Sequence, residues 1–290
     1  MSITLTPLTD PDYRPFSRRI AWLAADADGN PVGSAFLRLN SRQVAAHLAE
    51  LQLNVHPAER RRGIGSQLLG AVVGGARDHE VRTLITDAPA GSPADLFLEH
   101  HHFEIGLTLV YARLQLADAD PTVDDVPGYR LISWRGVVPD ELAQRFTDAR
   151  TGMNDAPSGS IEYGEDVWDV ERTRYAAQVI EQRGEHLATV AAVDESTGLI
   201  VGFSELVVPG DGKGEAQHYG TAVLPQHRGH GLARWMKAEQ IRQTRDHFPD
   251  LSTLITDTVD TNTAMRRTNT ALGYKPTETI HRRILDVCTY

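Results

Sequence analysis

Cysteine is nearly absent from this chain, in which Cys288 is the only one among 290 residues. A single thiol cannot form an internal disulfide, which excludes a disulfide-stabilised secreted fold and favours the reducing cytoplasm. No apolar run reaches the roughly 18 residues needed to cross a bilayer, so we expect no membrane association. The opening residues MSITLTPLTDPDY have neither a basic start nor an apolar core, so we expect no secretory signal.

Positive charge is also scarce, since 29 basic residues face 39 acidic ones and the formal net charge is −10. Such an acidic chain is a poor nucleic-acid binder, because neutralising phosphates requires a basic surface. Acidity is compatible with a cationic partner such as an amine. Only three lysines occur, namely Lys213, Lys237 and Lys275. We interpret this scarcity as codon bias in a GC-rich genome.

Two parts of the sequence repeat each other at a nearly constant distance. The stretch HPAERRRGIG at 56–65 has a counterpart, LPQHRGHGLA, at 224–233, and LITD occurs at both 84–87 and 254–257. Because these landmarks keep their order and spacing, the sequence predicts a duplicated domain. A repeat this long indicates two whole domains rather than a solenoid.

The repeat divides the chain into an N-terminal domain (1–117), a linker (118–127) and a C-terminal domain (128–290). Clustered prolines and acidic residues favour the linker assignment. Apolar periodicity predicts a hairpin, a third strand, a helix, a fourth strand and a second helix in each copy. In the second copy these elements are expected at 186–193, 199–208, 216–223, 232–247, 253–259 and 260–274. The fold class is therefore α/β, with two mostly antiparallel sheets flanked by helices.

A turn with arginine and glycine lies between a strand and a helix in each copy. The start of a helix leaves backbone N–H groups unpaired, and glycine lets that backbone approach a ligand closely. We therefore expect an anion cradle for phosphate or pyrophosphate. The turn residues are Arg228, Gly229, His230, Gly231, Leu232 and Ala233, and in the first copy Arg60, Arg61, Arg62, Gly63, Ile64 and Gly65. Neither turn has the lysine and hydroxyl pair of a P-loop.

In both copies this pattern resembles motif A of the GNAT acetyltransferase superfamily, and NTAMRRTNTALGY, led by Asn262, resembles its motif B. The resemblance covers essentially the whole chain. It implies acetyl-CoA as the donor, with its pyrophosphate on the amides of the turn. It also implies direct attack of an amine on the thioester, with the acetyl carbonyl held by the backbone amide of the strand valine, Val223 or Val55.

The second copy departs from the family pattern at the proton-transferring residues. Where many members have a glutamate base, this chain has Gln217, so Glu205 or His218 is the expected base. The alternative is that both are ordinary exposed strand residues. Where the family usually has a tyrosine acid, this chain has Asn269. The thiolate would then leave unprotonated or take a proton from water, which a thiol pKa near ~8.5 tolerates.

The first copy departs further. By the same count Gly91 replaces the leading asparagine, Leu98 the tyrosine and His102 the glycine of motif B. We expect this shortened copy to be non-catalytic. It either still binds a CoA-like anion or is a purely structural half.

The acceptor site is expected in the additional segment of the second copy. Carboxylates and aromatic rings at 153–171, including Asp155, Tyr163 and Trp168, would attract a cationic amine. The alternative is a solvated, acidic helix start. Adjacent histidines at 100–102 point in different directions on a helix, so we expect no metal site.

Together these features predict an acetyl-CoA-dependent N-acetyltransferase that acts on a small-molecule amine in the C-terminal domain. A non-catalytic acyl-CoA sensor and a mycothiol-synthase-like acetyltransferase are the alternatives. The sequence contains no readable signal for an oligomeric state.

Overall fold

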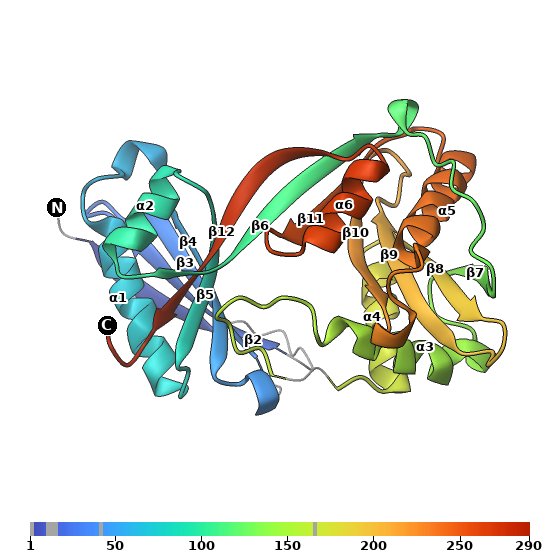
Figure 1. Ribbon diagram of the computed structural model, residues 1–290. Coiled ribbons are helices and arrows are strands. Elements are labelled where there is room, and N and C mark those ends of the chain that lie inside the picture. Colours follow the sequence, from blue (N-terminus) through green and yellow to red (C-terminus); the bar gives the residue numbers. More distant parts are fainter. Residues whose placement is uncertain (1–2, 10–16, 41–42, 165–166) are drawn as a thin grey trace. The chain divides into compact units, whose positions relative to one another are not determined.

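The computed structural model describes residues 3–9, 17–40, 43–164 and 167–290 (Figure 1). The chain forms two compact units, each built from separate stretches of sequence. Unit 1 contains Met1–Thr108, Ser158–Gly164 and Ile280–Tyr290, and unit 2 contains Leu109–Pro157 and Glu165–Thr279. No helix in the described ranges is long and apolar enough to cross a membrane.

Unit 1 is a sheet in the order β1-β2-β3-β4-β5-β12, in which only β4 and β5 run parallel to each other. Its strands are β1 Thr4–Thr9, β2 Ser17–Ala25, β3 Pro31–Asn40, β4 Leu48–Val55, β5 Thr83–Pro89 and the last part of β12 Lys275–Asp286. Its helices are η1 Gln43–Ala45, η2 Pro57–Glu59, α1 Ile64–Asp78 and α2 Pro93–His100.

Helix α1 packs on β2, β3 and β4, and its buried residues recur at the 3.6-residue spacing of a helix with one apolar face. The helix and sheet approach so closely that a Cβ at Gly75 would lie 2.6 Å from the Trp22 ring. Its buried residues are Ile64, Leu68, Leu69, Val72, Val73 and Ala76.

Unit 2 has the strand order β6-β11-β10-β9-β8-β7, and only β10 and β11 are a parallel pair. Its strands are the last part of β6 Glu104–Gln115, β7 Tyr129–Arg135, β8 His186–Asp194, β9 Ile200–Val208, β10 Gly214–Val223 and β11 Leu251–Val259. Its helices are η3 Leu116–Asp118, η4 Asp140–Leu142, α3 Ala143–Ala149, η5 Arg150–Met153, α4 Val170–Gln182, η6 Pro225–His227, α5 Leu232–His247 and α6 Thr263–Ala271.

Helices cover both faces of the sheet in unit 2. Successive strand residues point to opposite faces, so alternate residues of β8 belong to different core clusters. Val190 and Ala192 of β8 share a core cluster with Trp235 of α5. The alternate residues Ala191 and Val193 lie in a second cluster with α3. All nine residues of β9 are buried, as expected for a strand covered on both sides. The α/β class is confirmed.

One predicted helix start is wrong. The helix expected at 260–274 is α6, which begins only at Thr263 and has Asn262 as its N-cap. The Asn262 side chain accepts a hydrogen bond from the Met265 N–H at 3.1 Å. A side-chain acceptor three residues before that N–H satisfies one of the unpaired donors at the helix start.

The two copies of the repeat exchange their last strands. The strand that ends the first copy, β6, pairs through its residues 109–115 with β11 of unit 2. The strand that ends the second copy, β12, pairs through 280–286 with β5 of unit 1. The compact units therefore differ from the contiguous ranges 1–117 and 128–290, which stay a prediction about the copies of the repeat.

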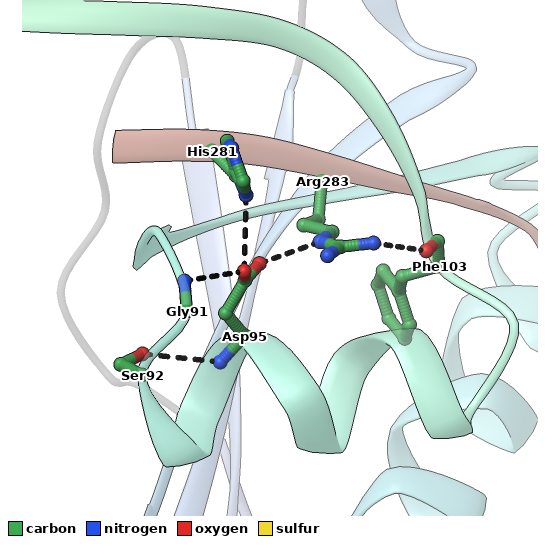
Figure 2. Close-up of polar contacts among 6 residues, drawn as sticks. All are labelled: Gly91, Ser92, Asp95, Phe103, His281 and Arg283. Carbon is green, nitrogen blue, oxygen red and sulfur yellow. Dashed lines mark hydrogen bonds and ion pairs between the residues drawn. The ribbon is translucent and has the colours of Figure 1, made fainter. Parts of the chain in front are cut away.

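A buried polar cluster fixes β12 in unit 1 (Figure 2). The carboxylate of Asp95, from α2, accepts hydrogen bonds from Arg283 Nε at 2.7 Å and from the Gly91 N–H at 2.9 Å, and it lies 3.0 Å from His281 Nδ1. Arg283 also donates to the Phe103 carbonyl at 2.9 Å. Burial raises the pKa of Asp95, but these hydrogen bonds outweigh it and lower the pKa to about 2. The carboxylate is therefore ionised and paired at neutral pH.

Replacing Arg283 with methionine should leave the Asp95 carboxylate buried without its ion-pair partner. Breaking one partner out of a buried ion pair costs about 3–5 kcal/mol, which urea unfolding at neutral pH would measure. The folded-state pKa of Asp95 lies below its ordinary value of 3.8. The stability it contributes is therefore present above that pH and is lost as pH falls toward 2, so the difference between wild type and Arg283→Met should narrow there.

Arg38→Met is the matched control, because Arg38 pairs with Glu50 while both side chains are about half exposed. An exposed pair contributes at most about 1 kcal/mol. Equal, small losses in both variants would show that the Asp95 cluster does not stabilise unit 1.

Candidate active site

The turn between β10 and α5 has the conformation expected of an anion cradle. Gly229 and Gly231 have positive φ angles of 82° and 84°, and α5 begins directly afterwards at Leu232. Apart from the adjoining residues, no heavy atom of the described part of the chain lies within 4 Å of a Cβ built on either glycine. The main chain is therefore open to a ligand at the point where the first N–H groups of a helix lack intrahelical partners.

Arg228 braces this turn. Its Nε donates to the Val223 carbonyl at 2.8 Å, and its two terminal nitrogens bind the Asp155 carboxylate at 2.6 and 2.7 Å. The hydrogen bonds from Arg228 lower the pKa of Asp155. The guanidinium thus connects the end of β10 to the segment after α3. The sequence predicts Arg228 as a cofactor-binding residue, and the structure gives it these protein contacts.

A cavity of about 680 Å³ adjoins the turn. It opens where β10 and β11 separate, because their last described parallel pair is Gln217 with Ile255. Residues 218–223 of β10 and 256–259 of β11 line it beyond that point. Seven of the predicted cofactor-binding residues also line it, namely Val223, Arg228, Gly229, Gly231, Leu232, Ala233 and Asn262. The ring of His230, which is not among the lining residues, lies 5.9 Å from the Tyr129 ring.

His218 lies in the cavity wall and is buried. Its Nε2 is 2.6 Å from the hydroxyl oxygen of Tyr274, and its Nδ1 has no hydrogen-bond partner among the described residues. Burial lowers the pKa of His218 well below its usual value, and the charge of Lys237 adds to the shift. Burial likewise raises the pKa of Tyr274. The imidazole is therefore neutral near pH 7.

Glu205 is also buried, but it is not among the residues that line the cavity. One of its carboxylate oxygens accepts a hydrogen bond from Arg150 at 2.5 Å. Burial raises the pKa of Glu205, while the adjacent guanidinium opposes the shift. The alternative in which Glu205 and His218 are ordinary exposed strand residues is wrong, since both are about 5% exposed.

The residues predicted for the acceptor site lie in different surroundings. Asp155 lines the cavity and pairs with Arg228. Two guanidinium groups lie over the Trp168 ring, with Arg150 Cζ 4.3 Å and Arg172 Cζ 3.9 Å from the ring centre. Tyr163 belongs to unit 1, where its hydroxyl accepts a hydrogen bond from Arg282 at 3.1 Å. The structure therefore does not bring these three side chains together in one unit.

The corresponding turn in unit 1 keeps part of this geometry. Arg60 Nε donates to the Val55 carbonyl at 3.1 Å, as Arg228 does to Val223. Gly63 has a φ of 78°, but Arg61 holds the second positive φ, 64°, where unit 2 has Gly229. Strands β4 and β5 also separate, after Glu50 and Ile85.

Other contacts cover the helix start of unit 1. A Cβ at Gly65 would lie 3.2 Å from the Phe97 ring, and Ser66 Oγ is 2.9 Å from His101 Nε2. Arg62 pairs with Glu59 at 2.6 Å, and Ile64 is buried in the core.

Ser92 caps α2 by accepting a hydrogen bond from the Asp95 N–H. Ser92 rather than Gly91 is therefore the counterpart of Asn262.

Sequence reasoning missed Arg150, Tyr274 and Lys237. Lys237 lies four residues before the fully buried Ile241 on α5, which places it on the inner face of the helix. That spacing was the available signal. Within the described ranges, no three His, Cys, Asp or Glu side chains form a group that could hold a metal ion.

Comparisons with known proteins agree with this architecture. The model of the acetyltransferase (GNAT) family matches residues 4–103 and 155–274, which is more than half of the chain. A curated relative, the mycothiol acetyltransferase of Stackebrandtia nassauensis, is 27% identical over 252 residues, covering 86% of this chain and 77% of that protein.

Two solved structures share the fold. A tandem GNAT protein from the clavulanic acid biosynthesis pathway has a TM-score of 0.74 at 24% identity, with 95% of this chain and 85% of that chain covered. A GCN5-related N-acetyltransferase from Sphaerobacter thermophilus has a TM-score of 0.70 at 18% identity, with 92% and 80% covered. The chain therefore belongs to the GNAT acetyltransferase family and is an acyltransferase with two such regions in tandem.

Proposed function

We propose that the chain transfers an acetyl group from acetyl-CoA to an amine of a small molecule, and that the reaction takes place in unit 2. The observation that carries this proposal is the cavity of about 680 Å³ that begins at the turn around Gly231 and reaches the separation of β10 and β11. The open main chain at Gly229 and Gly231 fits a diphosphate. The cavity has room for an extended arm that ends in a thioester.

Direct attack of the amine suits this arrangement. The thioester carbonyl at the separated strands would lie beside main-chain N–H groups that are no longer used in the ladder, including that of Val223. Such donors stabilise the oxyanion that develops as the amine attacks. The amine must first lose a proton, and His218 is the proposed base because it lines the cavity and is neutral. Glu205 forms an ion pair with Arg150 and does not line the cavity, so we propose that it affects the reaction only through the residues around it.

The acceptor is proposed to be a small amine, and within unit 2 its binding is proposed to involve Asp155, which lines the cavity, and Trp168, whereas Tyr163 belongs to unit 1 and is not part of this site. The name of the curated relative supports a mycothiol-type amine as one candidate.

The single cysteine, Cys288, supports a cytoplasmic location. Unit 1 is proposed to be non-catalytic, because Arg61 and Phe97 restrict its turn.

Turnover is tested by mixing the protein with acetyl-CoA and a panel of small amines, including the des-acetyl form of mycothiol, and following free thiol. We expect amine-dependent thiol release with at least one member of the panel. Tight binding of CoA without turnover on any amine would instead favour the second candidate function, an acyl-CoA sensor.

Calorimetric titration with CoA should locate the binding turn. Gly231→Trp places a side chain at a φ of 84° in the open cradle and should abolish the tight binding of CoA that we expect in unit 2. Gly63→Trp is the matched control, because Gly63 has a φ of 78° and an equally open Cβ position in unit 1. Loss of the strong site in Gly63→Trp, with binding retained in Gly231→Trp, would place the reaction in the other unit.

The base is tested through the pH dependence of kcat with an accepted amine. Because the pKa of His218 lies well below 6.5, the base form is lost only under acidic conditions, and kcat should fall there. His218→Phe should remove this acidic limb and lower kcat about 10²–10⁴-fold.

Tyr274→Phe removes the hydrogen bond between the Tyr274 hydroxyl and His218 Nε2 but keeps the imidazole, so this variant should retain the acidic limb of the kcat profile. Glu205→Gln should leave the limb in place. An unchanged profile in His218→Phe would exclude His218 as the base.

A further inference from the structure

Unit 2 contains a buried amine in the wall of its cavity. Lys237, on α5, is 1% exposed and is one of the residues that line the cavity. Its Nζ donates to Asn269 Oδ1 at 2.7 Å. Lysine is almost never fully buried unless it is paired, because removing an ammonium from water is costly. A neutral side-chain amide is a weak partner for such a charge.

The groups that face Lys237 come from three other elements. Asn269 of α6 is itself held by a hydrogen bond from its Nδ2 to Thr258 Oγ1 at 3.1 Å. The Tyr274 ring lies 4.7 Å from Nζ. Asp257 on β11 acts on Lys237 through its negative charge, and the charge of Lys237 in turn lowers the pKa of His218 on β10. Burial lowers the pKa of Lys237 to about 7, and the negative charge of Asp257 opposes that shift. The amine therefore gains and loses its proton near neutral pH.

The position of Lys237 relates it to the end of the donor's arm. It lies five residues beyond Leu232, which is about 7.5 Å along the axis of α5 from the anion cradle. His218, the first residue of β10 beyond the parallel ladder, lines the same cavity. Because Lys237 and His218 line the same cavity as the cradle, we expect an arm that runs from the cradle to the separated strands to pass this amine.

We propose that Lys237 Nζ is the group that gives a proton to the departing sulfur of the thioester carrier. This inference rests on the proposed function of unit 2. The acceptor nitrogen forms a bond to the carbonyl carbon, the carbon–sulfur bond breaks, and its electron pair goes to sulfur. The ammonium of Lys237 passes one proton to that sulfur and becomes neutral. The acceptor nitrogen gives its first proton to His218 before the attack, and the second proton that it loses as the amide forms restores the ammonium, directly or through water.

The scarcity of lysine makes a direct test possible. With lysine labelled at Cε by ¹³C, the chain gives three signals, and the other two lysines, Lys213 and Lys275, are exposed. We expect one signal to titrate near pH 7 in the free protein. Its pKa should rise when CoA binds, because a thiolate favours the ammonium, and it should rise less with desulfo-CoA, which lacks the thiol. The missing signal in Lys237→Met assigns it.

The bound thiol provides the second measurement, as the ultraviolet absorbance of its thiolate against pH. The thiolate should form about 1–3 pH units lower in the wild type than in Lys237→Met, since an adjacent cation favours the anion. Arg242→Met removes a charge from the same helix, at a half-exposed residue paired with Glu239, and should match the wild type.

The outcomes separate this inference from the proposed function. If CoA binds to wild type and Lys237→Met alike and its thiol ionises at the same pH in both, the sulfur does not meet Lys237 and the inference is overturned. An identical lysine titration with CoA and desulfo-CoA overturns it without relying on a variant that folds. If CoA does not bind to the wild type, the proposed function fails instead.

Discussion

The separation of two parallel strands is the constraint on which the candidate site depends. Strands β10 and β11 pair only as far as Gln217 and Ile255, and the cavity occupies the space beyond them. Separation leaves main-chain groups free for a ligand, and it places the inner faces of α5 and α6 against that space. His218 on β10 and Lys237 on α5 are buried titratable groups, and both line this cavity.

Much of the local structure was predictable because it depends on neighbours in sequence. Helix α5 spans Leu232–His247, as its periodicity predicts, and glycine at 229 and 231 permits the positive φ angles found there. The exchange of β6 and β12 was not predictable. Asp95 and Arg283 are 188 residues apart, and nothing local in either segment specifies the other as its partner. Strand periodicity indicates which face is buried but not which strand lies alongside.

The same distinction applies within the site. The turn was recognised from six consecutive residues, whereas the roles of its side chains depended on distant partners. Arg228 is occupied by Asp155, 73 residues away, and Glu205 by Arg150, 55 residues away. Lys237 is the sharpest case. Its rarity suggested codon usage, but the fold buries it against Asn269 and Tyr274, and this burial lowers its pKa to about 7.

The exchanged strands have a consequence for how the molecule can be divided. Cutting the chain within 118–127 would separate the two copies of the repeat, but each fragment would keep a strand that belongs to the other's sheet. The N-terminal fragment would lack β12, leaving one side of β5 and the carboxylate of Asp95 without their partners. Unpaired strand edges promote association between molecules. Each half therefore needs a strand from the other copy to complete its sheet, and a single polypeptide supplies both copies in equal number.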